Sequence, residues 1–207
     1  LVYHEGYNED PLPFNPNGDC ESGGIYFAST DILAFSDYGT GVYEVEPIGE
    51  IYENPGEPQK YKAHALNMQY VGKIDDLDTV KYLVCNGVNI HACDEYALRW
   101  YAKNGNLEIV KYLVENGADV HVLDDIALCW SANKGHLEVV KYLIEQGANI
   151  HAKEDKALRW SANDGHLEVV KYLVEKGADI HANDDYALCW SAENGHLKVV
   201  KYLKSLD

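Results

Sequence analysis

The second half of the chain repeats itself every 30 residues, and this period constrains the fold more than any other feature. Four blocks align in register at 91–120, 121–150, 151–180 and 181–207, and a degenerate fifth copy occupies 61–90. A unit of this length cannot bury both of its faces alone, so stacked copies must share one continuous core. The sequence therefore predicts an elongated, mainly α-helical repeat stack.

Each block has the pattern of two short helices. The segment Ala-Leu-(Arg/Cys)-Trp-(Ser/Tyr)-Ala has room for about two helical turns, and a glycine such as Gly135 then ends the helix. The second helix carries apolar residues at helical spacing, as in Leu107, Val110 and Leu113. An acidic residue precedes each first helix and is expected to cap its free N–H groups. These residues are Glu95, Asp125, Asp155 and Asp185.

One tryptophan recurs at the same place in every block. The series is Trp100, Trp130, Trp160 and Trp190, with Tyr70 at the matching place in the degenerate copy. A repeated aromatic stripe belongs to a packed core more often than to a cofactor site. The sequence predicts a buried tryptophan ladder, in which truncation of one indole to alanine costs ~3 to 5 kcal/mol.

The second-helix motif resembles that of the ankyrin repeat. Gly-His-Leu-Glu-Val-Val-Lys-Tyr-Leu-(Ile/Val)-Glu-x-Gly-Ala-(Asp/Asn)-Ile occurs at 135–150 and again at 165–180. The resemblance implies an ankyrin-type α-solenoid of about five short repeats. Two departures concern the hairpin: the period is shorter than the family's ~33 residues, and Tyr186-Ala187-Leu188-Cys189 replaces the family's Thr-Pro-Leu-His. The histidine that ties neighbouring loops together in the family is therefore absent.

The combination of Ala-Leu-Arg-Trp, Val-Lys-Tyr-Leu and Ile-His-Ala is similar to ankyrin proteins encoded by giant DNA viruses of amoebae. The stretch from Gly6 to Phe27 resembles the non-ankyrin domain that precedes the repeats in such proteins. Those proteins have further residues ahead of this point, so the chain is expected to be a fragment. The resemblance implies an intracellular protein of the host cytoplasm, and it implies no activity for the front domain.

Residues 1–60 lack a helical period and read as a small acidic α+β domain, followed by the repeat domain at 61–207. They contain 12 acidic residues and one basic residue, Lys60. Turn dipeptides separate short predicted strands at 25–28, 41–45 and 48–52, and residues 30–35 are predicted to form a helix. A domain of this size is expected to pack on the first repeat.

Charge and cysteine content limit the functions that this chain can have. The formal net charge is −17, and such an acidic surface repels phosphate backbones, so no nucleic-acid partner is predicted. A basic or neutral protein partner fits that net charge better. No apolar run is long enough to span a bilayer, so no membrane contact is predicted. Five cysteines without a CxxC pair indicate a reducing compartment rather than a disulfide or zinc framework.

Two kinds of chemistry compete with a pure binding role. His91, His121, His151 and His181 form a ladder, but stacked repeats place equivalent atoms roughly 10 Å apart, whereas zinc–nitrogen bonds need ~2.0–2.1 Å. A structural role is therefore predicted, with no metal and no cofactor. His136, His166 and His196 start the second helices and are expected to cap them. Cys20 with His4 or His64, beside Asp10 and Asp19, offers a nucleophile and a base, but without a supporting motif, so no enzyme is predicted.

Positions that vary between otherwise equal blocks are candidates for partner binding. In ankyrin proteins the corresponding positions line the concave face and the hairpin tips. They are Leu123, Lys153 and Asn183 at the tip; Tyr96, Ile126, Lys156 and Tyr186 at the start of the first helix; and Lys103, Asn133, Lys134, Asn163, Asp164 and Glu193 at its end. The sequence favours a non-catalytic scaffold that binds a host or viral protein. An enzyme in the front domain and an adaptor for a ubiquitin ligase are the alternatives.

Overall fold

The computed structural model describes residues 6–9, 25–27, 41–54 and 60–206. The helix predicted at 30–35 lies outside these ranges, as do Cys20, His4, Asp10 and Asp19. The chain forms two compact units, Leu1–Ala97 and Leu98–Asp207. The predicted division into domains at 60/61 stays a prediction.

A four-stranded antiparallel sheet is the main element in the described part of the first unit. Its strands are β1 (Gly6–Glu9), β2 (Ile25–Phe27), β3 (Gly41–Asn54) and β4 (Lys60–Lys73). Strand β4 pairs with β3 along its length and with β1 and β2 at successive stretches. The strands predicted at 41–45 and 48–52 are parts of one strand, β3, whose register shifts between Ile48 and Ile51.

The degenerate copy at 61–90 contains one helix instead of two. Its first half is strand β4, because the apolar residues there alternate with period two: Ala63 and Ala65 are buried on one face. Tyr70 is exposed and packs edge-on against Tyr43, so its predicted place in an aromatic core ladder is wrong. Helix α1 (Leu77–Cys85) follows and contacts β4.

Asp76 caps helix α1. Its carboxylate accepts hydrogen bonds from both the backbone N–H and the hydroxyl of Thr79, each at 3.0 Å. These bonds hold the pKa of Asp76 below its ordinary value, the backbone bond contributing most. The capping contribution is therefore present above pH 3.8 and is lost as the pH falls through the lowered pKa.

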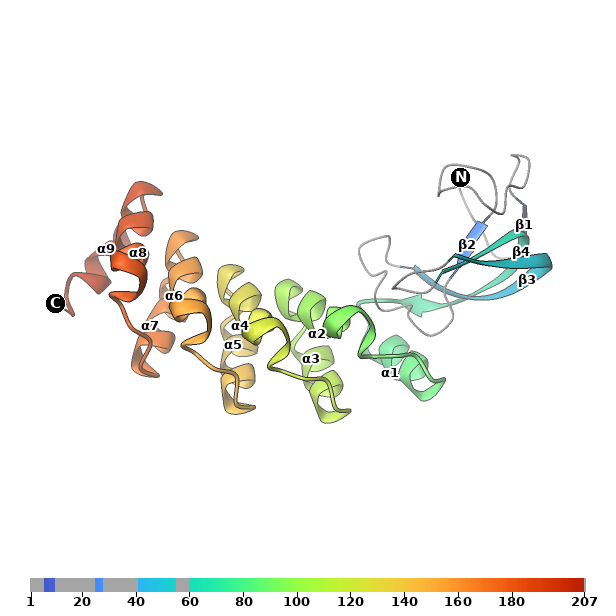
Figure 1. Ribbon diagram of the computed structural model, residues 1–207, viewed down its shortest axis with the longest axis horizontal. Helices are drawn as coiled ribbons and strands as arrows, with labels where there is room; N and C mark the ends of the chain where they lie inside the picture. The colour runs from blue at the N-terminus through green and yellow to red at the C-terminus, as the bar shows by residue number, and fades with distance from the viewer. Residues whose placement is uncertain (1–5, 10–24, 28–40, 55–59, 207) are drawn as a thin grey trace. The chain divides into compact units, whose positions relative to one another are not determined.

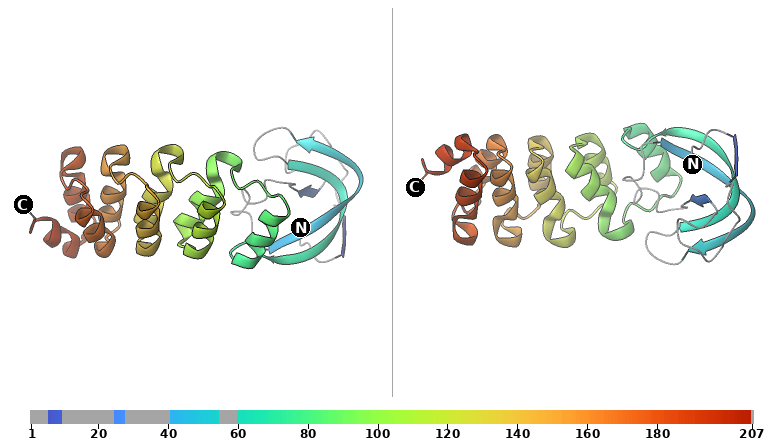
Figure 2. Two further views of the ribbon diagram at one scale, coloured as in Figure 1. Left: turned by 90° about the horizontal axis from the view of Figure 1, so that it is seen from below. Right: turned by 90° about the horizontal axis from the view of Figure 1, so that it is seen from above.

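Helical hairpins from the four 30-residue blocks follow one another in register (Figure 1). The first helices are α2 (Ala92–Asn104), α4 (Val122–Asn133), α6 (Ala152–Asn163) and α8 (Ala182–Glu193). The second helices are α3 (Leu107–Glu115), α5 (Leu137–Glu145), α7 (Leu167–Glu175) and α9 (Leu197–Leu203). Within the second unit, Figure 2 shows the hairpins from α4 to α9 standing side by side. Neighbouring first helices approach one another more closely than neighbouring second helices do.

The core of the stack consists of small and branched aliphatic side chains. The predicted second-helix stripe is confirmed, since Val110 and Leu113 are fully buried and the other copies repeat this. In the first helices most buried positions are leucine, alanine and serine, as in Leu128, Ser131 and Ala132, but Tyr101 is also fully buried at the place that serine takes in the later repeats. Ser131 donates to the carbonyl of Leu128 at 2.9 Å, so its hydroxyl is satisfied inside the core.

The prediction that the tryptophans form the core ladder is wrong. Trp100, Trp130 and Trp160 are half-buried, and Trp190 is 41% exposed. In α4 and α6 the buried residues after the tryptophan are serine and alanine, while the indole itself stays partly exposed.

A left-handed turn opens every first helix. Leu123, Asp124 and Asp125 have φ values of 50°, 56° and 57°, and the other three blocks repeat this conformation. Asp and Asn tolerate the left-handed region better than most residues, and they occupy many of these positions. The acidic residue that ends the turn bonds to the loop that leads from its own hairpin into the next repeat instead of capping its own helix. Asp125, which is 5% exposed, accepts from the backbone N–H of Asn149 at 3.0 Å, and Asp155 accepts from Asp179 at 3.1 Å.

Candidate functional site

Basic side chains lie over aromatic rings along the first helices. The Arg99 guanidinium and the Lys103 ammonium are each 5.6 Å from the Trp130 ring centroid. The Lys156 ammonium is 4.0 Å from the Trp160 ring. The Arg159 guanidinium is 5.0 Å from the Tyr186 ring. We call this set, completed by Trp190, the aromatic–basic strip.

The strip continues from one repeat into the next. Arg99 belongs to α2 and Trp130 to α4, whereas Arg159 belongs to α6 and Tyr186 to α8. Tyr186 in turn stacks on Trp190, with centroids 4.8 Å apart and planes inclined by 18°. A cation placed over an indole or phenol face is attracted by the ring quadrupole. These contacts keep the aromatic residues ordered at the surface.

Arg159 also stabilises the left-handed turn of its own repeat by two hydrogen bonds. Its Nε donates to the carbonyl of Glu154 and its Nη2 to that of Lys153, both at 2.7 Å. These bonds satisfy two carbonyls in a backbone conformation that costs L-residues roughly 1–2 kcal/mol each. The turn is therefore held rigidly beside the strip.

The structure divides the predicted contact residues near the turn into exposed and buried ones. Leu123 is 46% exposed, and Asn183 and Lys153 are also exposed; Lys153 pairs with Asp124 at 3.5 Å. Ile126 is only 8% exposed, so its predicted place on the open face is wrong. It lies one residue after the turn, where the side chain points into the core. The half-buried candidates here are Tyr96, Lys156 and Tyr186.

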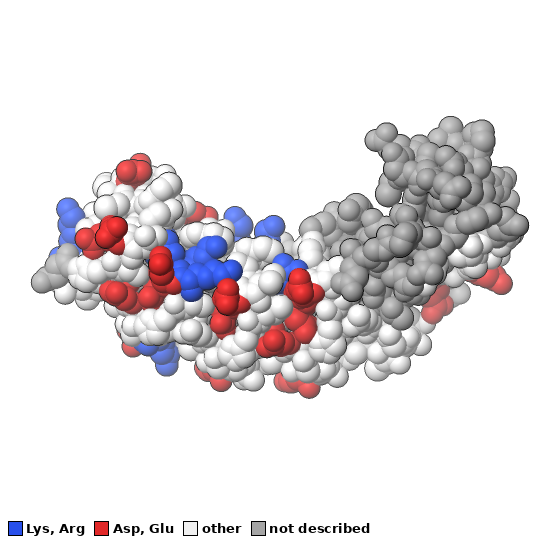
Figure 3. Space-filling model, viewed as in Figure 1, with Lys and Arg blue, Asp and Glu red and all other residues white. Residues whose placement is uncertain are grey.

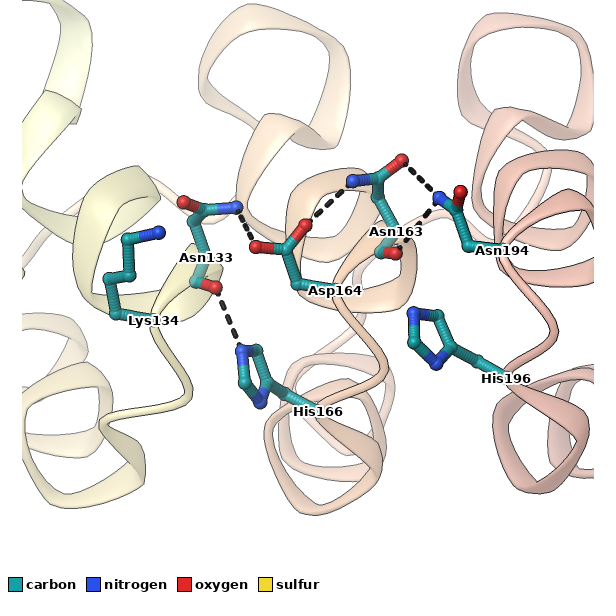
Figure 4. A pocket seen from close by; sticks show the side chains of 7 residues that line it. All are labelled: Asn133, Lys134, Asn163, Asp164, His166, Asn194 and His196. Carbon is teal, nitrogen blue, oxygen red and sulfur yellow. Dashed lines mark hydrogen bonds between the residues drawn. The ribbon is translucent and has the colours of Figure 1, made fainter.

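A polar network joins three repeats at the other end of the first helices (Figure 4). Asp164 accepts from the Asn133 amide at 2.8 Å and from the Asn163 amide at 2.6 Å. The Asn194 amide donates to both the backbone and the side-chain oxygen of Asn163. Three predicted contact residues, Asn133, Asn163 and Asp164, are thus occupied in joining repeats. Exposed candidates at this end are Lys103, Lys134 and Glu193.

This network lines an open polar pocket of about 580 Å³, which also includes residues that were not predicted as contacts. They are His166, Asn194 and His196. The His166 Nε2 contacts the carbonyl of Asn133 at 2.8 Å, and the His136 Nε2 contacts that of Lys103 at 3.0 Å. These histidines occupy the N-cap positions of α7 and α5 but make no side-chain capping bond there, so the predicted cap is wrong. They connect each hairpin to the preceding one.

The histidines of the other ladder bind carboxylates. The Nδ1 of His121 lies 3.0 Å from Asp125, and that of His151 lies 3.0 Å from Asp155. Asp125 and Asp155 also bond to the loop that leads into the next repeat, so each pair of histidine and aspartate connects the two turns, as the family's missing histidine would do. Among the described residues, no three His, Cys, Asp or Glu side chains gather as a metal site.

Burial makes the thiol of Cys129 unreactive because it disfavours the thiolate. Burial raises its pKa to about 11, whereas Cys189, at the same place in the last repeat, is exposed. At pH 8 roughly one Cys129 thiol in a thousand is ionised, and the thiolate is the reactive form. We expect iodoacetamide at pH 8 to modify Cys189 at least ~100-fold faster than Cys129. Peptide mapping by mass spectrometry measures both rates in one sample, and equal rates would contradict the burial of Cys129.

The enzyme alternative depends on Cys20 with His4 or His64. Cys20 and His4 lie outside the described residues, and His64 lies in strand β4.

No helix in the part of the chain that the structure describes is long and apolar enough to cross a membrane.

Comparison with known proteins agrees with the repeat architecture. A family model of ankyrin repeats in three copies matches residues 68–154 and 151–207, and the chain belongs to this family. Ankyrin repeats generally mediate protein–protein interaction. The chain is also 36% identical over 113 residues to a protein named as an ankyrin repeat protein of Acanthamoeba polyphaga mimivirus. This alignment covers 50% of the chain and 37% of the relative, so the chain spans little more than a third of that protein.

Proposed function

We propose that this chain is a non-catalytic scaffold that binds a host or viral protein through the aromatic–basic strip and the adjoining turn tips. The observation that carries the proposal is the placement of the indoles. The core is filled mainly by leucine, valine and alanine, with Tyr101 as its one fully buried aromatic residue among those described, while Trp130 and Trp160 are partly exposed and Trp190 is exposed, all three in register. Tryptophan, tyrosine and arginine are the residues most enriched where proteins bind one another.

The arrangement of the strip suits a protein ligand better than a small molecule. The strip runs over α2, α4, α6 and α8, so a ligand must extend across several hairpins to contact all of it. Half-buried aromatic rings lose little conformational entropy on binding because their neighbours already hold them in place. The turn tips differ between repeats, as Leu123, Lys153 and Asn183 show, and would add selectivity at the edge of the strip.

The proposal predicts that binding depends on the strip tryptophans. A displayed library of random 12-residue peptides is selected against the wild-type chain, and binding of the selected peptides is measured by fluorescence anisotropy. We expect the double change Trp160→Ala and Trp190→Ala to weaken binding at least tenfold, since interface aromatic residues commonly contribute ~2 kcal/mol or more.

Tyr172→Ala is the matched control for this measurement. Tyr172 lies on α7, in the layer of second helices, and also has lysines over its ring, Lys141 at 6.0 Å and Lys176 at 5.5 Å. Its loss should leave peptide binding within about twofold of wild type, given that its ring lies outside the strip. Selected peptides that bind the tryptophan variant as tightly as the wild type would refute the proposal.

A further inference from the structure

Lysines in the two helical layers have different partners. On α3, α5 and α7 the lysine in the middle of the helix pairs with a glutamate one turn earlier, Lys111 with Glu108, Lys141 with Glu138 and Lys171 with Glu168, at 3.2, 2.7 and 2.9 Å. In α9 the place of that glutamate is taken by Lys198. In the strip, Lys103 and Lys156 lie over indole rings, and no carboxylate within the described ranges pairs with them. The lysine charge is thus neutralised on α3, α5 and α7, whereas the two strip lysines have aromatic partners instead.

Acidic residues are missing from the helical parts of α2, α4 and α6, and α2 and α6 carry the basic residues of the strip. Residues 96–104, 126–133 and 156–163 contain four basic residues and no acidic one, whereas α8 has no basic residue and ends with the exposed Glu193. The nearest buried acids, Asp125 and Asp155, are engaged in bonds within the stack. The exposed Glu154 precedes the helical part of α6, whereas the Lys156 side chain extends over the Trp160 ring. Figure 3 shows a cluster of basic residues over this part of the molecule, with acidic side chains at its border.

We infer that the segment bound by the strip is an extended acidic peptide of the partner protein, with apolar side chains between its carboxylates. This inference rests on the proposed function and adds the chemistry of the ligand. Carboxylates would pair with the exposed sides of the Lys103 and Lys156 ammonium groups. An apolar side chain between them would pack on Trp130, which lies on the intervening hairpin.

The repeat spacing sets the distance between the two acidic positions. Lys103 and Lys156 are two hairpins apart, about 20 Å when neighbouring helices are ~10 Å apart, and their positions in the repeat differ by ~10 Å along the helix axis, so they are about 22 Å apart. An extended chain advances ~3.3 Å per residue. Carboxylates separated by about seven residues therefore match the two lysines.

The net charge of the chain does not prevent this choice of ligand. The value of −17 points to a basic or neutral partner when charge is treated as a single sum. At physiological ionic strength, however, exposed charges are largely screened beyond ~8 Å. The charges in contact with the ligand then decide the affinity, and those of the strip are positive.

Three labelled 12-residue peptides test the inference by fluorescence anisotropy with the full chain. The acidic peptide has two Glu-Asp pairs whose starts are about seven residues apart, the distance between Lys103 and Lys156, with leucine and phenylalanine between them. The neutral peptide has Gln-Asn in place of each pair, and the basic one has Lys-Lys. We expect the acidic peptide to bind about tenfold more tightly than the neutral one, and the basic one to bind most weakly.

Matched lysine variants locate the effect. The change Lys103→Gln with Lys156→Gln should weaken binding of the acidic peptide about tenfold, while Lys141→Gln with Lys171→Gln, which removes the same charge from the other layer, should leave it unchanged. Lys103→Arg with Lys156→Arg should keep binding, which excludes a mere loss of folding.

Any other outcome of the peptide and lysine measurements refutes the acidic ligand, and the tryptophan variant shows whether the proposed function fails with it. Equal or tighter binding of the neutral or basic peptide, or equal losses in both glutamine variants, refutes the acidic ligand. If library-selected peptides lack acidic residues but still require Trp160 and Trp190, the acidic ligand is wrong and the proposed function stands. If no peptide depends on these tryptophans, both fail.

Discussion

Replacing Leu143 with alanine should lower the free energy of unfolding by about 2–5 kcal/mol. Leu143 lies on α5 in the middle of the stack and is 0% exposed, so its truncation removes buried methyl groups and leaves a cavity. Neighbouring helices on both sides restrict how far the site can collapse. Chemical denaturation followed by circular dichroism measures the loss.

Leu197→Ala provides the matched control for this prediction. Leu197 begins α9 in the last hairpin and is 75% exposed, so the same chemical change should alter stability by no more than about 0.5 kcal/mol. Trp160→Ala should fall between the two values because the indole is half-buried. If Trp160→Ala cost more than Leu143→Ala, the assignment of the indole to the surface would be wrong.

The change Gly135→Ala should destabilise the stack more than Gly117→Ala does. Both glycines have positive φ, 76° and 99°, so each alanine carries the strain of the left-handed region, roughly 1–2 kcal/mol. A Cβ on Gly117 would meet open space, whereas a Cβ on Gly135 would lie 2.5 Å from the His166 Nδ1. His166 must then move, which breaks its contact with the Asn133 carbonyl and adds about 1–3 kcal/mol.

A double-mutant cycle separates the steric effect from the backbone strain. His166→Ala removes the ring that the new methyl group would strike, so the double variant should be less destabilised than the sum of the two single changes. Strictly additive losses would mean that the ring and the glycine are not packed against each other. Denaturant midpoints for the three variants and the wild type supply the comparison.

The sequence did not predict which residues are buried where a helix has apolar residues on two faces. In Ala-Leu-Cys-Trp-Ser-Ala, both Leu128 and Trp130 are plausible core residues, and helical periodicity does not separate them over so short a segment. The contact between neighbouring first helices decides between them, since it has space for leucine, alanine and serine. Tyr70 was wrongly aligned with the tryptophans because its segment is equally short. That segment forms strand β4 and lacks the tryptophan and the helix-ending glycine of the other repeats.

Variation between repeats predicted only some of the candidate contact residues correctly. Variation between repeats identified Lys103, Lys156 and the exposed turn tips, but it also selected Asn133, Asn163 and Asp164, which vary because they form a network specific to those repeats. Variation cannot distinguish a surface that binds a partner from an irregular junction between hairpins. The indoles of the strip were missed as contacts because they are invariant.

The sequence by itself determined the 30-residue period, the two helices of each hairpin, the glycines that end them and the membership of the ankyrin repeat family, because these follow from local conformation and from self-similarity. Only the tertiary structure decided which way the tryptophans face, which carboxylates join neighbouring turns and which histidines cross from one hairpin to the preceding one. Those contacts join atoms 24 to 33 residues apart, so they depend on how closely the repeats stack. That spacing is a property of the packed stack and not of any single repeat.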